Sequence, residues 1–433
     1  MKSTSSTKKA SKSAGTSVPT RASSAPRGFS CLGYLLMIII VVVAVIFYRI
    51  YYQVLAINVS LDSIPETISG SVCRQIPLPG GVDNIGGTED LEFVGDGSWA
   101  IVSNMDPQMT FMLKPVPKAT FPLFAFNIEA EAALAPLPLE GFPSHVSFRP
   151  HGISYHRESN TLGVINHAWT FGGERIEFFT VIFEDQKPIG LQYIKSVASP
   201  AMGYGQLNDL QVVQVDPVVK FYVTNWWGHP MGGDNGPSLS AKARFLGGLI
   251  AGINSCTILY CEGDKCRTTG GAALGYNGIY ISHDKSKLAT VVLGDHGLNL
   301  YDILPSGDLS FIGHVHVGYP LDNIYPDLEA STSSKQVFYS GGIRRPIDML
   351  HAIDNINKPN RTRDDIAIPS HARRITIEWG EDNNTNKPSY TVEEVYSTRA
   401  KDNIGAWSVF AKVPNSNKYI IGSFLEPSLL VCG

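Results

Sequence analysis

The stretch "GQLNDLQVV", residues 205–213, places Asn208 and Asp209 side by side in a run that otherwise has the composition of a β-strand. Asn and Asp are depleted in strands, and a buried carboxylate without a partner is costly. An Asn-Asp pair is also a common turn sequence. A turn is therefore one interpretation of this stretch, and a strand that presents two ligand side chains is the other.

The same arrangement recurs along the chain. Five times, two polar or glycine residues are followed at once by Leu or Ile and then by strand-like residues. Their second members stand 45 to 69 residues apart, somewhat longer than the repeat of about 40–50 residues that is typical of propeller blades. The spacing predicts blades with extended loops, each beginning its innermost strand with one pair. The pairs are Glu89-Asp90, His151-Gly152, Asn208-Asp209, Asn277-Gly278 and Asp322-Asn323.

The composition agrees with an all-β fold. Beyond residue 50 the chain consists of short β-branched runs separated by turn residues, and its 433 residues include 41 Gly and 27 Pro. A hydrophobic content of 43% is ample for a sizeable core. Many short strands at fairly even spacing are typical of a sandwich, a barrel or a propeller, and the repeated pairs favour the β-propeller.

Innermost strands of a propeller line a central channel, so the pairs should converge at one end of it. Because side chains alternate along a strand, the two neighbours in a pair can serve two centres, one above the other. Clustered carboxylate and amide oxygens favour calcium, which takes about 6–8 oxygen ligands, over ordinary turns. An upper cluster would contain Glu89, Asn208, Asn277, Asp322 and Asn323, and a lower pair Asp90 and Asp209.

Two histidines accompany these residues. His151 belongs to the repeated pattern and should face the same channel end, while His167 ends an apolar strand. A lone histidine in either place is more commonly a satisfied core residue than a catalytic one. The sequence contains no G-x-S-x-G, P-loop or G-x-G-x-x-G motif, which argues against a serine hydrolase and against nucleotide chemistry.

The N-terminal region is predicted to anchor the chain in a membrane. Residues 1–27 form a basic, Ser-rich head that should be disordered and cytoplasmic, and residues 28–48 carry no charge. About 20 apolar residues suffice to span a bilayer, and the basic flank places the remainder on the lumenal or extracellular side. A cleavable signal peptide is the alternative. We thus expect a head (1–27), a transmembrane signal-anchor (28–48), a stalk (49–72) and a β-propeller (73–433).

The remaining features suit the endoplasmic reticulum or the cell surface. Residues 50–433 carry 28 Lys and Arg against 39 Asp and Glu, a net charge of −11, which disfavours a nucleic-acid partner. N-x-S/T sequons predict glycosylation on the lumenal side. They begin at Asn58, Asn360 and Asn383.

Six cysteines suggest an oxidising compartment. A bridge between Cys73 and Cys432 would join the two ends of a ring-like fold. Cys261 and Cys266 flank a plausible hairpin loop and form the second expected bridge, which leaves Cys256 without an assigned partner.

Several short sequence motifs, taken in order, resemble those of the paraoxonase/arylesterase family over roughly residues 70–433. They are "CRQI…GTEDLE", "PHGIS", "NH" after an apolar strand, "LNDL", "NGIYIS", "LDNI" and a cysteine at the extreme C-terminus. The resemblance implies a six-bladed propeller closed by a Cys73–Cys432 disulfide, with two calcium ions in its channel. It also implies a hydrolase of lactones and aryl esters, lactones being the first expectation.

Carried over motif by motif, the resemblance assigns roles to individual residues. The catalytic calcium would be held by the upper cluster, and the structural calcium by Asp90, Asp209 and the backbone carbonyl of Ile153. His151 and His167 would form a catalytic dyad, with His151 deprotonating a water molecule.

The chain also departs from the family pattern. It adds the basic head, and residues 226–271 match poorly. Some membrane-anchored nematode relatives resemble accessory or assembly subunits of ion channels, so a non-enzymatic chaperone or channel partner is the alternative to a hydrolase.

Overall fold

The computed structural model of the chain describes 13 stretches of it. The chain divides into two units, residues 1–47 and 48–433. The predicted glycosylation sites Asn58, Asn360 and Asn383 lie outside the described residues. The described stretches are residues 31–50, 60–68, 72–79, 86–105, 121–168, 173–203, 207–228, 240, 248, 254–355, 362–379, 388–401 and 403–433.

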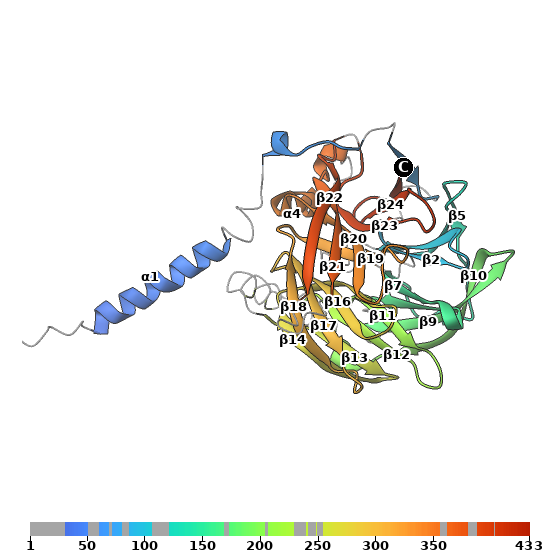
Figure 1. Cartoon of the computed structure of the whole chain (residues 1–433), viewed down its shortest axis with the longest axis horizontal. Coiled ribbons are helices and arrows are strands. Elements are labelled where there is room, and N and C mark those ends of the chain that lie inside the picture. The colour runs from blue at the N-terminus through green and yellow to red at the C-terminus, as the bar shows by residue number, and fades with distance from the viewer. Residues whose placement is uncertain are drawn as a thin grey trace, which may run out of the picture. The chain divides into compact units, whose positions relative to one another are not determined.

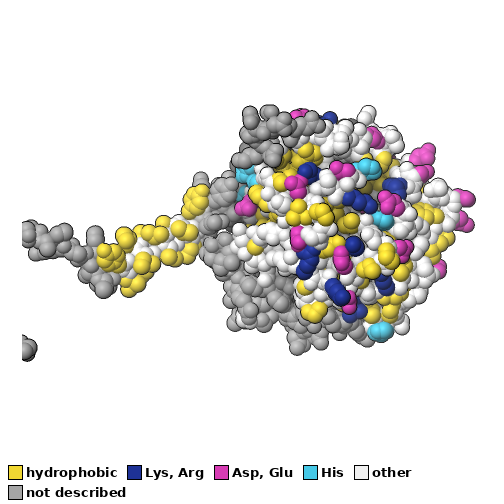
Figure 2. Space-filling view, turned by 60° about the horizontal axis from the view of Figure 1, so that its bottom comes forward, with side chains coloured by type: hydrophobic (Ala, Val, Ile, Leu, Met, Phe, Trp, Pro, Cys, Tyr) yellow, Lys and Arg dark blue, Asp and Glu magenta, His cyan; other side chains and the backbone are white. Residues whose placement is uncertain are grey.

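Helix α1 (Cys31–Ile50) lies mostly in the first unit and overlaps the predicted membrane segment 28–48. Apolar side chains dominate its described part, residues 33–48, and are exposed (Figure 2). Across the residues that the structure describes, no helix reaches the length and apolarity needed for a membrane crossing.

The second unit is a six-bladed β-propeller, as the sequence predicted. Six sheets make up the unit, and in each the consecutive strands run from the innermost outward, with β6 added to the second sheet and β1 to the sixth. Figure 1 shows β2, β7, β11, β19 and β23 grouped near the middle of the unit and β5, β10, β14 and β18 near its periphery. The first blade comprises β2 (Gly87–Val94), β3 (Trp99–Met105), β4 (Phe124–Asn127) and β5 (Ala132–Pro136). The second comprises β7 (Pro150–His156), β8 (Thr161–Asn166), β9 (Arg175–Glu184), β10 (Lys187–Val197) and the added β6 (Leu139–Glu140). The third comprises β11 (Leu207–Gln214), β12 (Lys220–Asn225), β13 (Cys256–Glu262) and β14 (Lys265–Ala273). The fourth blade comprises β15 (Tyr276–Ile281), β16 (Lys287–Val292), β17 (Gly297–Ile303) and β18 (Leu309–His316). The fifth comprises β19 (Leu321–Pro326), β20 (Lys335–Ile343), β21 (Ser370–Glu378) and β22 (Ser389–Thr398). The sixth comprises β23 (Trp407–Lys412), β24 (Tyr419–Ser423), β25 (Ser428–Cys432) and β1 (Cys73–Pro77).

The sixth blade is built from both ends of the propeller. Strand β1 pairs antiparallel with β25, and Cys73 stands directly opposite Cys432 in this pairing. The two cysteines form a disulfide across 359 residues, which confirms the predicted ring closure. The second predicted bridge, Cys261–Cys266, also forms, and Cys256 is a buried free thiol.

Apolar side chains fill the spaces between neighbouring blades. Along β3, Ala100 and Val102 pack toward the sixth blade, whereas Trp99 and Ile101 pack toward the second. Because successive side chains point to opposite faces, a strand buried between two blades is apolar on both faces. This is why β3 is buried along its whole length and why such runs lack a clean polar–apolar alternation in the sequence.

Helix α4 (Pro346–Asn355) covers part of the end at which the inner strands begin. Met349 and Ala352 pack there with Met105, Phe424 and Leu425. Charged side chains of both signs are interspersed over the face that Figure 2 presents, consistent with a surface on which ion pairs such as Arg74–Glu131 form.

We predict that the two disulfides differ widely in their contribution to stability. In the chain-entropy model a bridge across several hundred residues stabilises by about 5–6 kcal/mol, and one across a few residues by about 2 kcal/mol. Replacing Cys73 and Cys432 with Ser should therefore lower the free energy of unfolding far more than replacing Cys261 and Cys266. Denaturant titrations of both double variants measure this, and equal losses would contradict the role of β1 in closing the ring.

Candidate functional site

Every inner strand departs from regular pairing at the same level. At that level two residues of the inner strand stand opposite one residue of the second strand, which is the geometry of a β-bulge. The bulged residues are 89–90, 151–152, 208–209, 277–278, 322–323 and 408–409. The five predicted pairs thus occupy five bulges, and Ser408–Val409 occupies the sixth.

In two of these bulges a hydroxyl group on the second strand accepts the hydrogen bond of a bulged backbone amide. The Asp90 amide donates to Ser103 Oγ, and the Asp209 amide donates to Thr224 Oγ1, both at 3.0 Å. The backbone groups that the irregular pairing frees are thereby satisfied, which allows the bulges to be buried.

The lower pair, Asp90 and Asp209, links neighbouring blades. Asp90 accepts hydrogen bonds from the amides of Leu91 and Ile153, both at 2.8 Å, so one carboxylate connects the first and second blades. Asp209 does the same for the third and fourth blades through Leu210 (2.7 Å) and Ile279 (2.8 Å). Each of the four carboxylate oxygens therefore accepts one backbone amide.

Glycines make room for this arrangement. A Cβ atom on Gly152 would lie 2.4 Å from the Asn208 carbonyl oxygen and 2.7 Å from Asp209 Cα. A Cβ atom on Gly278 would lie 2.6 Å from Asn323 Cα. The glycine of one pair is thus required by the close approach of the next blade's pair.

Members of the upper cluster contact one another near the start of the inner strands. Asn323 Nδ2 donates to the Glu89 carbonyl oxygen (3.0 Å) and lies 3.3 Å from Glu89 Oε1. Four buried acceptor oxygens of this cluster have no hydrogen-bond partner among the described residues. They are Glu89 Oε2, Asn208 Oδ1, Asn277 Oδ1 and Asn323 Oδ1.

The carboxylates of the site repel one another. Burial, followed by the nearby charges of Asp322 and Asp90, raises the pKa of Glu89 well above its usual value. Burial raises the pKa of Asp322 to about 7, although a hydrogen bond with Asn277 lowers it. Burial also raises the pKa of Asp90 to about 7, and burial and then Asp90 raise the pKa of Asp209. A bound cation would reverse these shifts.

The donor set fits calcium. Within the described stretches, no three His, Cys, Asp or Glu side chains gather in a geometry that could hold a metal ion; the upper cluster combines carboxylates with amides instead. Carboxylate and amide oxygens are ligands that calcium accepts at flexible geometry. Unpaired buried oxygens are costly unless something binds them, and the upper cluster has four as far as the described residues show.

His151 and His167 meet beside this cluster. Their ring centroids are 4.9 Å apart, with the planes inclined at 68°. His151 Nε2 lies 3.2 Å from Asn208 Nδ2 and 3.5 Å from Glu89 Oε1. Burial, with a smaller effect of His167, holds the pKa of His151 well below its usual value, so this imidazole is neutral near pH 7.

Two residues of the site escaped sequence interpretation. Ser408 belongs to the sixth bulge, where its Oγ donates to the Thr88 carbonyl oxygen at 3.2 Å and its hydroxyl lowers the pKa of Glu89. Glu174 Oε2 lies 2.6 Å from His167 Nδ1. Ser408 directly precedes an apolar strand run in the last blade. This position is the one feature of the sequence that could have indicated the sixth bulge.

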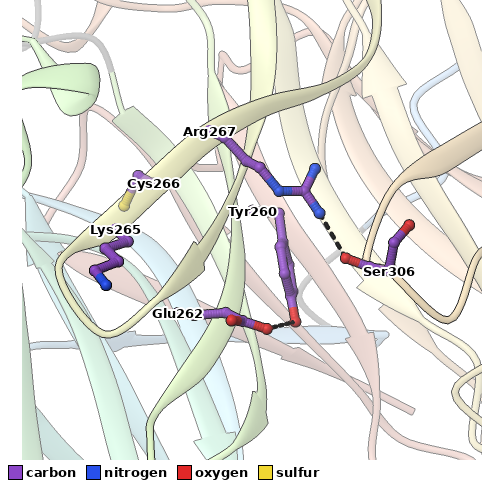
Figure 3. A pocket seen from close by; sticks show the side chains of 6 residues that line it. All are labelled: Tyr260, Glu262, Lys265, Cys266, Arg267 and Ser306. Carbon is purple, nitrogen blue, oxygen red and sulfur yellow. Dashed lines mark hydrogen bonds between the residues drawn. The ribbon is translucent and has the colours of Figure 1, made fainter.

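A separate small pocket lies at the other end of the third blade. It has a volume of about 200 Å³ and lies beside the turn that joins β13 and β14 (Figure 3). The register places Glu262 opposite Lys220, at the end of this sheet remote from Asn208. Glu262 forms an ion pair with Lys220 and Arg267 with Asp308, and the pocket, at the remote end of the sheet, is distinct from the candidate site. Its lining residues are Tyr260, Glu262, Lys265, Cys266, Arg267 and Ser306.

Fold and site together define a six-bladed propeller with a buried, oxygen-rich centre at one end of its channel. No known family model matches the sequence, and no curated protein matches it significantly. The chain is similar in structure to a structural-genomics target described as a gluconolactonase (12% identity; 84% of this chain and 93% of that chain; TM-score 0.44). It is also similar to a luciferin-regenerating enzyme (11%; 81% and 92%; 0.42) and to Kuenenia stuttgartiensis hydrazine synthase (12%; 79% and 75%; 0.42). At these identities and TM-scores the chemistry has to be argued from the chain's own residues.

Neighbouring residues of one bulge should respond differently to substitution. Asp209→Ala leaves the buried amides of Leu210 and Ile279 without an acceptor, at a cost of about 1–3 kcal/mol for each. Asn208→Ala removes an oxygen that has no partner among the described residues and one hydrogen bond, from Nδ2 to His151 Nε2, and should cost less than Asp209→Ala in a chelating buffer. Chemical denaturation of both variants without calcium measures the difference, and equal losses would refute the two separate roles.

Gly152→Ala should destabilise the propeller by about 1–3 kcal/mol, because its methyl group would overlap backbone atoms of the third blade. Gly271→Ala is the matched control, since a Cβ atom there would meet no heavy atom within 4 Å. This exposed position should tolerate the change within about 0.5 kcal/mol. Thermal denaturation of the two variants compares them directly, and similar melting temperatures would contradict the close approach of the two blades.

Proposed function

We propose that the chain is a calcium-dependent hydrolase of lactones and aryl esters. The observation that carries the proposal is the group of four buried acceptor oxygens without a partner in the described residues, placed beside a histidine pair. Those oxygens and Asp322 form the ligand set of the catalytic calcium. Asp90, Asp209 and the Ile153 carbonyl would hold the structural calcium.

Calcium, when bound, would polarise the ester or lactone carbonyl and stabilise the developing oxyanion. The chain's own residues supply the rest. The neutral His151 ring accepts a proton from water at Nε2, the nitrogen that lies nearest Glu89 and Asn208. Glu89, Asn208, Asn277, Asp322 and Asn323 fix the place where the carbonyl oxygen is bound, and the apolar contacts between blades keep that place rigid.

The uncharged run of residues 28–48 supports a membrane anchor with the basic head in the cytoplasm. Such an anchor would place the propeller in the lumen of the endoplasmic reticulum or outside the cell. The two disulfides suit that compartment.

The purified full chain should hydrolyse phenyl acetate and members of a lactone panel in calcium, and the activity should vanish in chelator. His151→Gln should lower kcat by about 10²–10⁴, the usual contribution of a general base. His156→Gln, five residues later in β7 and bonded to Ser159 Oγ, is the matched control and should keep the activity.

Calcium binding is measured separately, by calorimetry and by the calcium-dependent rise in melting temperature. A folded protein that binds calcium but hydrolyses none of these substrates would refute the hydrolase. That outcome would favour the accessory role, in which the propeller assists membrane proteins such as ion channels.

A further inference from the structure

Glu174 is a buried carboxylate next to the histidine pair. It directly precedes β9, and its side chain is fully buried. Its Oε2 atom lies 2.6 Å from His167 Nδ1, a short contact between two buried titratable groups. Burying a carboxylate is costly without a strong partner. His167 is such a partner for Glu174, and the contact also constrains the histidine.

The hydrogen-bonding types of the neighbours fix the tautomers of both rings. A carboxylate accepts, so His167 Nδ1 carries a proton and its Nε2 is left as the basic nitrogen. An amide nitrogen donates, so Asn208 Nδ2 makes His151 Nε2 an acceptor and leaves the proton of that ring on Nδ1. His151 Nδ1 is buried and has no partner in the described part of the chain. Both rings therefore carry hydrogen on Nδ1 and a lone pair on Nε2.

We propose that Glu174 is a positioning residue that fixes the Nδ1–H tautomer of His167 and thereby directs proton transfer away from His151. The inference rests on the hydrolase function proposed above. It adds Glu174 to the dyad as a third, acidic member. Glu174 orients the ring of His167, the histidine that lies farther from the ester, and does not touch substrate itself.

The proton transfer can be written in full. A water O–H bond breaks as its oxygen bonds to the carbonyl carbon, and the proton passes to His151 Nε2. The Nδ1 proton of His151 then moves to the Nε2 lone pair of His167 once the rings, whose centroids are 4.9 Å apart, turn so that these two nitrogens come within hydrogen-bonding distance. Glu174 Oε2 keeps accepting from His167 Nδ1 throughout and lies next to the ring that receives the proton. Return of the proton to the leaving alkoxide restores all three groups.

Glu177 offers a matched control. It lies three residues after Glu174 and is also buried, but its carboxylate is bonded to Asn166 Nδ2 (3.0 Å) and to the Ser196 hydroxyl rather than to a histidine. Substituting Gln for either Glu removes one buried charge near the same strand while keeping the shape. Only one of the two substitutions should alter the chemistry.

Glu174→Gln in the full chain should lower kcat by about 100-fold, at the lower end of what acid–base catalysis supplies. KM should stay within about threefold, because Glu174 does not touch substrate. Glu177→Gln should keep kcat within about threefold even if its melting temperature falls. Wild-type kcat in Glu174→Gln, or the same loss in both variants, would overturn the proposal.

Proton NMR provides a readout that needs no turnover. The short Nδ1–H···Oε2 contact should give a low-field imidazole resonance, assigned by its loss in His167→Gln. This resonance should persist in Glu177→Gln and disappear or shift strongly upfield in Glu174→Gln. If the wild-type protein hydrolyses no ester, the proposed function fails, whereas the NMR result still decides whether Glu174 fixes the tautomer. An unchanged resonance in Glu174→Gln would refute that assignment.

Discussion

The pairing of β1 with β25 is the interaction on which the rest of the propeller depends. Each blade buries one face against the preceding blade and one against the following blade, so no sheet is complete without two neighbours. The first and last blades obtain their second neighbours only when the ring closes. The Cys73–Cys432 bridge and the pairing around it hold that closure, and the inner strands converge on the channel as its consequence.

Convergence alone would not create a site, because a regular strand turns only every second side chain toward the channel. The bulge in each inner strand places two consecutive residues opposite one, and this is how Glu89 and Asp90 can serve different neighbours. Glu89 belongs to the upper cluster, and Asp90 accepts a hydrogen bond from the next blade. In β11, likewise, Asn208 contributes an unpaired oxygen to the upper cluster and Asp209 hydrogen-bonds the fourth blade, which accounts for the unusual Asn-Asp sequence.

The sequence indicated much of this, because ligand side chains recur at the repeat and stand out from ordinary strand residues. The propeller, the Cys73–Cys432 closure, the Cys261–Cys266 bridge and the meeting of His151 with His167 were accessible in this way. The bulges were not, since register depends on a partner strand that no local pattern specifies. Ser408 and Val409 were overlooked because a serine and a valine are unremarkable in a strand. Glu174 was overlooked because its contact with His167 depends on how the chain returns between β8 and β9.

The distribution of β1 and β25 along the chain also has a consequence for biosynthesis. The two strands are separated by 359 residues at their cysteines, which a ribosome needs about 20–70 s to add at about 5–20 residues per second. During that time the nascent chain exposes the edge of β1 and the free thiol of Cys73, and the first blade lacks one neighbour. Ring closure therefore has to wait until β25 has been synthesised, and the first blade lacks its second neighbour until then.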